Sequence, residues 1–170
     1  MHTPTTDSYR IRSATRADVE AIRDILNYYI ENSTVIFVMK PQTLEERLVW
    51  FDAHSEVHPV TVIEVGGRVV GWGALSPFRP QTAYARTTEL SIYLQHEFIG
   101  RGLGRALVSD LLARAHRAGH HVVIGVCCSD AVASIKLLES FGFSRVGHLS
   151  EVGRKFDRWL DVVFLQLLLA

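Results

Sequence analysis

An alternating segment that leads straight into a glycine-rich loop limits most strongly how this chain can fold. The segment is Thr87–Leu94, TTELSIYL, in which one face carries Leu90, Ile92 and Leu94 and the other carries Glu89, Ser91 and Tyr93. It is followed by FIGRGLGRAL, Phe98–Leu107, where glycines stand at every second position from 100 to 104. A strand, a glycine turn and a helix start form a general anion site, because free backbone N–H groups and the helix dipole both favour negative charge.

The glycine loop has several interpretations. A nucleotide P-loop requires Gly-x-x-x-x-Gly-Lys-Ser/Thr, and this loop contains no lysine. A dinucleotide fingerprint requires Gly-x-Gly-x-x-Gly in an early β-α-β unit, whereas position 105 is Arg and the loop comes late in the chain. A plain turn and a pyrophosphate cradle of another kind remain, and we favour the cradle.

The rest of the chain alternates between strand and helix patterns. Strands are expected at residues 10–12, 60–65, 68–75, 87–94, 121–128, 143–148 and 159–168. Helices are expected after the capping boxes at Thr15 and Thr43, from the glycine loop to Gly119, and from Ser129 or Asp130 to Gly142. This order predicts an α/β (α+β) fold, with a mixed sheet and helices on both faces, in a single domain of residues 1–170.

Charge and hydropathy narrow the range of partners. Eighteen Lys and Arg balance eighteen Asp and Glu, so no overall field favours nucleic acid or anionic lipid. The C-terminal WLDVVFLQLLLA is shorter than the roughly 20 residues of a membrane helix, and we expect it to form a buried strand. Residues 1–8 are polar and lack the apolar core of a signal peptide, and we expect them to be flexible. These features predict a cytoplasmic protein with no nucleic-acid partner and no membrane partner.

We expect no metal site and no disulfide. The two cysteines, Cys127 and Cys128, are neighbours in a predicted strand and point to opposite faces, so a bond between them would be strained. Two His-x-x-x-His pairs occur, His54 with His58 and His116 with His120. Neither pair has an evident third ligand, so we interpret them as surface histidines.

From Thr87 to Gly104 the chain resembles the GNAT acetyltransferases, which bind acetyl-CoA at an Arg/Gln-x-x-Gly-x-Gly/Ala motif, here Ile99–Gly104. Within that superfamily it is most similar to the phosphinothricin and methionine sulfone/sulfoximine N-acetyltransferases. The similarity runs from Tyr9 onward and is carried by NYYIENSTVIF (Asn27–Phe37), TTELSIYL, ASIKLLESFGF (Ala133–Phe143) and VGRKFDRWLDVVFLQL (Val152–Leu167). The resemblance implies a GNAT fold with a mostly antiparallel sheet of about seven strands, and a homodimer.

The resemblance also implies that acetyl-CoA is the cosubstrate. Its pantetheine arm would lie along Leu90, Ser91 and Ile92, and its pyrophosphate on Phe98, Ile99, Gly100, Arg101, Gly102, Leu103 and Gly104. Further coenzyme contacts are implied at Ala131 and Ser134. Arg101 and Arg105 are interpreted either as phosphate contacts or as solvated side chains.

Glu89 aligns with the family's catalytic glutamate, which implies a role as general base. A partly desolvated carboxylate has a raised pKa and can take a proton from an amine that is mostly ammonium at neutral pH. The alternative is a solvated glutamate on a strand. The resemblance implies that the amine of a small amino-acid-like substrate attacks the thioester directly, that a backbone amide near Ile92 stabilises the oxyanion, and that CoA thiolate departs.

The family's substrate loop matches PFRPQTAY, Pro77–Tyr84, and implies substrate contacts at Phe78, Arg79, Thr87 and Thr88 beside Glu89. The Arg79 guanidinium can donate two parallel hydrogen bonds to a carboxylate, phosphinate or sulfone group. Tyr28, Tyr29 and Phe37 are interpreted as lining the pocket or as core, and core is favoured for Tyr29. Lys155, Trp159 and Asp161 match a C-terminal motif that lies near the dimer interface and the substrate mouth, although Trp159 is also consistent with a structural role.

Three positions depart from the family pattern. Ile99 stands where the coenzyme motif begins with Arg or Gln, Ala131 where relatives have asparagine, and Leu138 where a Tyr or His can protonate the thiolate. We expect coenzyme binding to persist, weakened about tenfold by the hydrogen bond lost at Ala131. The departures motivate an alternative, an acyl-CoA-binding sensor with little turnover. A protein N-terminal or polyamine acetyltransferase is a further alternative, although Arg79 argues against a polyamine.

Overall fold

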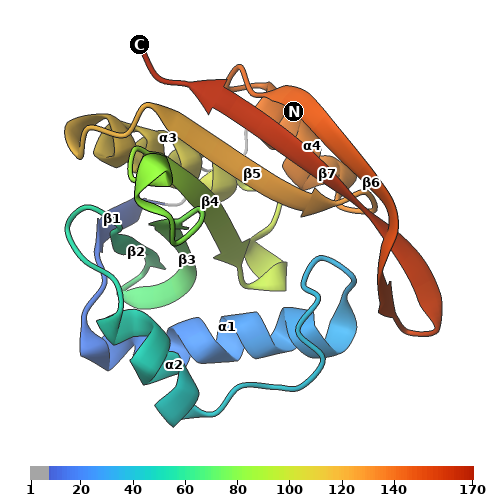
Figure 1. Cartoon of the computed structure of the whole chain (residues 1–170). Helices are drawn as coiled ribbons and strands as arrows, with labels where there is room; N and C mark the ends of the chain where they lie inside the picture. The colour runs from blue at the N-terminus through green and yellow to red at the C-terminus, as the bar shows by residue number, and fades with distance from the viewer. Residues whose placement is uncertain (1–7) are drawn as a thin grey trace, which may run out of the picture.

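The computed structural model of the chain describes residues 8–170, so most of the N-terminal segment expected to be flexible lies outside the described residues. Its strands are β1 (Tyr9–Ser13), β2 (Val60–Val65), β3 (Arg68–Pro77), β4 (Thr87–Leu94), β5 (Val122–Cys128), β6 (Ser144–Lys155) and β7 (Arg158–Leu168). Its α-helices are α1 (Val19–Asn32), α2 (Leu44–Asp52), α3 (Leu103–Arg117) and α4 (Val132–Glu139), as Figure 1 shows. This order of elements is the predicted one.

The strands form one seven-stranded sheet in the order β1-β2-β3-β4-β5-β7-β6. Only β4 and β5 are parallel neighbours, and the other strand pairs are antiparallel. The prediction of a mixed, mostly antiparallel sheet is therefore confirmed. The parallel pair follows from α3, because a crossover helix returns the chain to the same end of the sheet.

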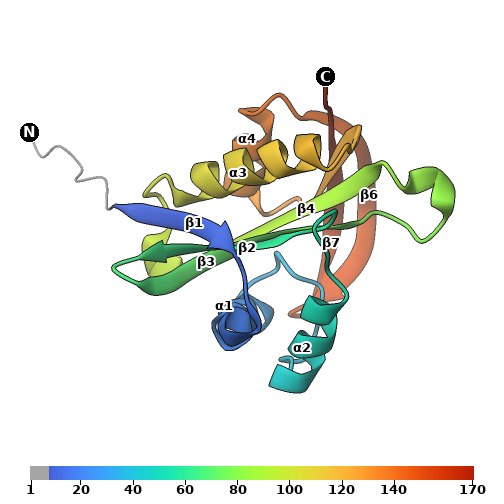
Figure 2. The same ribbon diagram turned by 90° about the vertical axis from the view of Figure 1, so that its left-hand side faces the viewer.

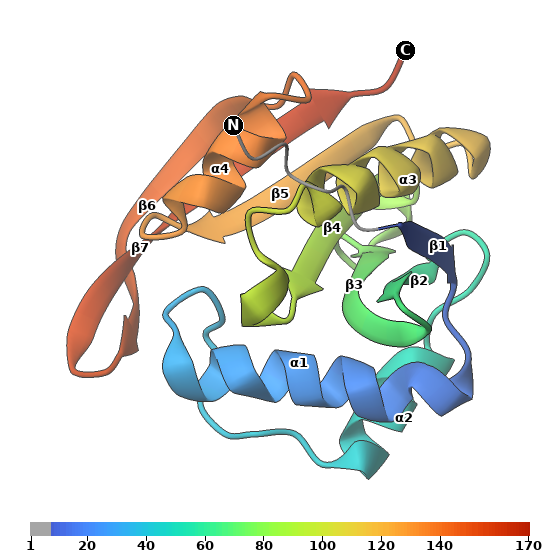
Figure 3. The ribbon, with the colours of Figure 1, turned by 180° about the vertical axis from the view of Figure 1, so that it is seen from behind.

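Helices cover both faces of the sheet, as expected. Figure 2 shows α1 and α2 on one side and α3 and α4 on the other, and the view from behind agrees (Figure 3). On the α1/α2 side, helix residues such as Ile22 and Leu26 pack with Val62 and Trp72. On the other side, α3 and α4 share a core that includes Leu111, Leu138 and Leu165. Within residues 8–170, no helix is long and apolar enough to cross a membrane.

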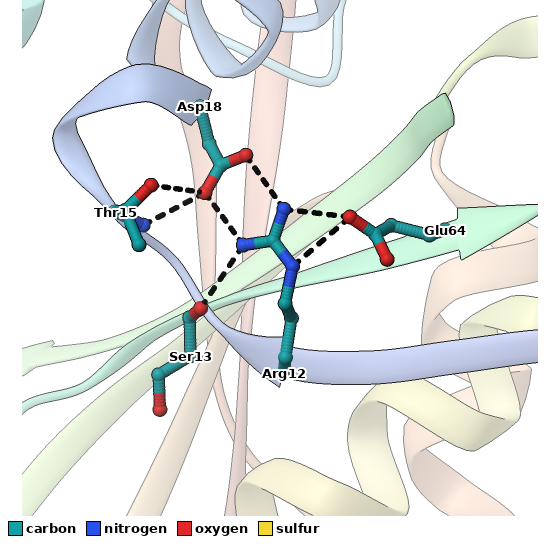
Figure 4. Close-up of polar contacts among 5 residues, drawn as sticks. All are labelled: Arg12, Ser13, Thr15, Asp18 and Glu64. Carbon is teal, nitrogen blue, oxygen red and sulfur yellow. Dashed lines mark hydrogen bonds and ion pairs between the residues drawn. The ribbon is translucent and has the colours of Figure 1, made fainter. Parts of the chain in front are cut away.

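The first capping box is part of an ion-pair network (Figure 4). The Asp18 carboxylate accepts hydrogen bonds from the backbone N and the hydroxyl of Thr15, at 2.7 and 3.0 Å. It also pairs with Arg12 of β1, whose guanidinium reaches Glu64 of β2 at 2.6 Å. Hydrogen bonds from Arg12 lower the pKa of Asp18 to about 2. The network ties the start of α1 to the edge of the sheet.

The second capping box is confirmed and the third predicted cap is wrong. At Thr43 the hydroxyl accepts from Glu46 N at 3.1 Å, and the Glu46 carboxylate accepts from Thr43 N at 2.8 Å. Helix α4 begins one residue after Ala131, which has no side-chain cap, instead of at Ser129 or Asp130. The Asp130 carboxylate accepts from Arg158 and Thr34 instead, at 3.1 and 3.3 Å.

The closing hairpin is longer than the sequence predicts. Strand β6 continues to Lys155 and meets β7 in a turn at Phe156 and Asp157, which both have positive φ angles of 49° and 57°. Tight turns of this kind usually carry Asn-Gly or Asp-Gly, and Phe-Asp is not such a signal. The C-terminal segment forms β7 with Leu160, Val163 and Leu165 buried, which confirms the predicted buried strand.

Candidate active site

Strands β4 and β5 separate near the middle of the sheet (Figure 1). Their parallel pairing covers only Thr87, Thr88 and Glu89 of β4, although β4 continues to Leu94 and β5 to Cys128. On its other edge β4 pairs with β3 over its whole length. Alternate backbone N–H and C=O groups of Leu90, Ser91 and Ile92 therefore face an edge that has no strand partner in the described part of the chain. Such an edge can bind an extended ligand as if it were an additional strand.

Glu89 is the last residue of β4 that pairs with β5, and its side chain lies on the α1/α2 side of the sheet. It is half-buried, and its carboxylate forms no hydrogen bond or ion pair with the described residues 8–170. Burial without a compensating partner raises the pKa of Glu89. A carboxylate of this kind is a better proton acceptor at neutral pH than a solvated glutamate.

The other groups near Glu89 hold their protons at neutral pH. Burial raises the pKa of Tyr93 to about 12 and the pKa of the Cys127 thiol to about 11. The thiol is thus a poor nucleophile, because the reactive form of cysteine is the thiolate. Both cysteines are free, as expected. Glu89 is the ionisable group of this region that suits base chemistry.

The glycine loop presents a set of free amides. Gly100 and Gly102 both have φ of +81°, and a Cβ at either would meet no atom within 4 Å, so the space beside the backbone is open. Gly102 is the N-cap of α3, and the first backbone bond of that helix runs from Ala106 N to Gly102 O at 3.2 Å. The amides of Gly100, Gly102 and residues 103–105 form no backbone hydrogen bond within the described chain. Free amides at a helix N-terminus fit a pyrophosphate group.

The two arginine side chains next to the loop contact other groups of the protein. Arg101 stacks over the Phe98 ring at 4.7 Å, and Arg105 donates to Ser140 Oγ at 2.8 Å. Ile99, at the position of the expected Arg or Gln, is 55% exposed. The polar part of the cradle is therefore backbone. Gly104 lies inside, where an added Cβ would approach Leu137 to 3.3 Å, which keeps α3 close to β4 and α4.

Two of the three positions that differ from the family pattern, Ala131 and Leu138, have a visible structural consequence. Ala131 contributes no side-chain hydrogen bond, and the adjacent Asp130 does not replace the missing asparagine because Arg158 and Thr34 hold it. Leu138 is buried and packs on Gly125, where an added Cβ would lie 2.5 Å from Leu138 Cδ1. Ser134 is exposed on the first turn of α4.

The expected substrate residues fall into two groups. Phe78 and Arg79 follow β3, with Arg79 exposed and its guanidinium 5.2 Å from the Phe78 ring. Thr87 is half-buried and shares the face of Glu89, since alternate strand residues point the same way. Thr88 is fully buried on the opposite face, and its hydroxyl donates to Ser76 O at 2.9 Å. The structure therefore does not bring the Thr88 side chain to Glu89.

The aromatic and C-terminal candidates are largely structural. Tyr29 is half-buried and donates to Leu94 O at 2.6 Å, which joins α1 to the end of β4, while Tyr28 is 40% exposed. Phe37 covers Gly153 of β6. Lys155 is buried, and its ammonium group donates to Ile36 O at 2.8 Å, which fastens the α1–α2 connection to the β6–β7 hairpin. No sequence pattern indicated this tether, because its two ends are 119 residues apart.

Trp159 and Asp161 lie on β7. Trp159 is 59% exposed, so it is not a core residue. The Asp161 carboxylate accepts from Glu151 N at 2.8 Å and pairs with His148 at 2.7 Å, and both contacts lower the pKa of Asp161.

The interpretation of the histidines as surface residues is wrong for three of them. His120 is 5% exposed, with its ring 5.1 Å from that of His58, which is half-buried like His54. The loop after α2 contacts His120, because His120 Nε2 lies 2.8 Å from Val57 O, and His54 contacts Trp50 and Ser76. Among residues 8–170 no group of three or more His, Cys, Asp or Glu side chains has an arrangement that could hold a metal ion.

Three features therefore occur together along β4 and the start of α3: a separated parallel strand pair, a carboxylate without a partner among residues 8–170, and a set of amides that can hold an anion. Residues 22–143 match the acetyltransferase (GNAT) family. The chain is 37% identical over 158 residues to a methionine sulfoximine/methionine sulfone acetyltransferase of Salmonella typhimurium, covering 92% of each chain. It is 36% identical to a phosphinothricin N-acetyltransferase of Streptomyces viridochromogenes, covering 92% of this chain and 85% of that one.

A solved acetyltransferase structure is similar to this chain over nearly its whole length. The phosphinothricin acetyltransferase of Sinorhizobium meliloti, in complex with acetyl-CoA, has a TM-score of 0.93 and 32% identity, over 95% of this chain and 89% of that chain. The chain belongs to the GNAT acetyltransferase family. It is an N-acetyltransferase.

Proposed function

We propose that the protein transfers the acetyl group of acetyl-CoA to the primary amine of a small amino-acid-like substrate, of the methionine sulfone/sulfoximine or phosphinothricin type. The observation that carries this proposal is Glu89, a half-buried carboxylate that has no partner among residues 8–170 and has a raised pKa, at the separation of β4 and β5. Relatives named for these substrates support the substrate class.

Glu89 is the general base. It takes a proton, directly or through one water, from the substrate ammonium group, so that the nitrogen lone pair is free. Acetyl-CoA supplies the acetyl group as a thioester. A backbone N–H near Ile92, on the unpaired edge of β4, donates to the thioester carbonyl oxygen as charge develops there. Because Leu138 has no donor, water supplies the proton to the CoA thiolate, which is a good leaving group near neutral pH.

Backbone groups account for coenzyme binding. Leu90, Ser91 and Ile92 hold the pantetheine arm, and the amides of Gly100, Gly102 and residues 103–105 hold the pyrophosphate. Phe98 and Arg101 flank the phosphates, while the Ile99 side chain adds no polar contact. Ala131 and Ser134 lie beside the pantetheine arm without a side-chain hydrogen bond to it. This arrangement tolerates the loss of the motif's first polar side chain.

Substrate recognition uses the exposed arginine after β3. Arg79 binds the substrate's carboxylate, phosphinate or sulfone oxygens, with Phe78 beneath it and Thr87 beside Glu89. A cation at this position disfavours a polyamine, because like charges repel. We further propose that the protein is cytoplasmic and forms a homodimer. The two subunits contact each other through their β6–β7 hairpins.

The test is incubation with acetyl-CoA and a panel of amines, with release of free thiol as the measurement. We expect release with methionine sulfone or phosphinothricin, and none with spermidine or with a peptide that has a free N-terminus. Release with the polyamine or the peptide alone would overturn the substrate class. Tight acetyl-CoA binding with no release on any amine would overturn the enzyme mechanism and favour an acyl-CoA sensor.

A further inference from the structure

A histidine and a serine lie between α2 and the proposed base. His54 follows the C-terminus of α2, with its Nδ1 2.8 Å from Trp50 O and its Nε2 3.2 Å from Ser76 Oγ of β3. Its ring also packs on Trp50, with the two centroids 4.3 Å apart. These contacts fix the orientation of the imidazole.

The contacts also fix where the protons lie. A carbonyl oxygen only accepts, so Nδ1 of His54 carries a hydrogen and donates to Trp50 O. In the neutral ring, Nε2 is then an acceptor, and the Ser76 hydroxyl donates to it. The ring is neutral near pH 7 because burial and the nearby Arg47 both lower the pKa of His54. The single hydroxyl proton of Ser76 is therefore committed to His54.

Ser76 is the direct cross-strand neighbour of Glu89. The two residues are partners in the antiparallel register of β3 and β4, so their side chains share a face and their Cβ atoms lie about 5 Å apart. A serine at this distance can donate to a carboxylate, directly or through one water. Within the described chain no hydrogen bond joins Ser76 Oγ to Glu89.

We propose that His54 is a positioning residue for Glu89: it binds the Ser76 hydroxyl proton, so that Ser76 presents only oxygen lone pairs to the Glu89 carboxyl group. The carboxylate is thereby denied its nearest hydroxyl donor, and the protonated acid gains an acceptor. Both effects keep the carboxyl group ready to take a proton. The catalytic meaning of this arrangement rests on the proposed function, but the arrangement itself does not.

Few other groups titrate near this chain of contacts. Arg47 of α2 and His58 of the following loop interact with His54, and Tyr93 of β4 and Cys127 of β5 interact with Glu89. Tyr93 and Cys127 stay neutral between pH 4 and 8, since their pKa values are about 12 and about 11. Arg47 stays charged over the same range. His54 and His58 change charge within this range, so the Ser76 hydroxyl is isolated by comparing His54→Phe with the double variant that also lacks this hydroxyl.

The test is a carbon-13 NMR titration of the Glu89 carboxyl group, assigned by its loss in Glu89→Gln. His54→Phe keeps a ring beside Trp50 but removes the acceptor, so Ser76 becomes free to donate to Glu89. We expect the pKa of Glu89 to fall by about one unit in His54→Phe. It should not fall in Ser76→Ala, nor in the double variant, because neither has the hydroxyl. His121→Ala, an exposed histidine outside this contact, is the matched control and should not change the titration.

The kinetic counterpart is the pH dependence of kcat/KM for the amine. The acidic limb should move to lower pH in His54→Phe and return in the double variant, with KM for acetyl-CoA unchanged. An unchanged Glu89 titration in His54→Phe would overturn the proposal, as would a double variant that titrates like His54→Phe. A different result would contradict the proposed function: full acetyl transfer by the Glu89→Gln variant. That result would not affect the interpretation of the NMR titration.

Discussion

Two carboxylates, one at the start of α1 and one on β4, have opposite surroundings. Asp18 is buried and receives donors from Arg12 and Thr15, which hold its pKa near 2. Glu89 is half-buried without donors, and its pKa is raised. The first arrangement stabilises the fold, and the second leaves a carboxylate free for a ligand, because an unpaired buried charge is costly and is retained where chemistry uses it.

Asp18 provides a stability prediction with a defined pH dependence. Because its pKa is lowered, its contribution is present above the unfolded-state value near 3.8 and is lost as pH falls toward about 2. Asp18→Asn should lower the free energy of unfolding by about 1–2 kcal/mol at pH 7, a range that allows for water screening of the partly exposed Arg12. The difference should shrink at pH 2.5. Urea unfolding at both pH values measures it, with the exposed Asp24→Asn as control. An equal loss at both pH values would contradict the ion-pair account.

Among the elements, the β4–loop–α3 unit is the proposed coenzyme site, and its polar groups are those of the backbone. The strand stops pairing with β5 after Glu89, and the helix begins at Leu103 with unbonded amides. Between them the chain turns through two glycines with positive φ. A side chain at Gly102 would strain this conformation and crowd the phosphates.

The matched comparison is Gly102→Ala with Gly119→Ala. Both glycines have nearly the same φ, +81° and +79°, and open surroundings, but Gly119 lies at the far end of α3. Both variants should lose about 1 kcal/mol of stability. Gly102→Ala alone should weaken acetyl-CoA binding at least about tenfold, since each charged hydrogen bond lost contributes that much. Isothermal titration calorimetry measures the affinity. Equal affinities of the two variants would show that the loop does not bind the phosphates.

Elements with local signals were predictable, and those set by distant contacts were not. Alternation placed β4, and the Thr43 capping box placed α2. The start of α4 was mispredicted because Arg158 and Thr34 take the Asp130 carboxylate. The His54–Ser76 contact next to Glu89 joins the loop after α2 to β3 across 22 residues, and the His-x-x-x-His spacing of His54 did not indicate it. The sequence thus indicated the base and the cradle through a family pattern, but not the side chains that tune the base.

At the scale of the whole molecule, the β6–β7 hairpin extends away from the sheet and its helices (Figure 1). Its exposed side chains include several large apolar ones: Val146, Leu149, Val152, Phe156 and Trp159. Exposed apolar patches of this kind mark interaction surfaces. A second copy of the chain is the proposed occupant, in agreement with the resemblance stated for this motif.

Trp159→Asp should therefore shift the protein from dimer to monomer. A charge at an apolar interface lacks a partner and costs several kcal/mol, which suffices to separate a dimer at micromolar concentration. Val49→Asp is the control, because Val49 is 70% exposed on α2, away from the hairpin. Analytical ultracentrifugation gives the mass. A wild-type monomer at high concentration, or a dimeric Trp159→Asp, would contradict the proposed interface.

Glu89 is proposed to remove the proton from the amine, and the Glu89→Gln variant tests this role. Glutamine keeps the shape but cannot accept the proton, so kcat/KM for the amine should fall about 10²- to 10⁴-fold. The Kd for acetyl-CoA should be unchanged, and the melting temperature at pH 7 should be equal or higher, because burial disfavours the charged form that the variant lacks. In the wild type, kcat/KM should fall as pH drops through a pKa above the ordinary glutamate value. Wild-type turnover by Glu89→Gln, with an unchanged pH profile, would contradict the account.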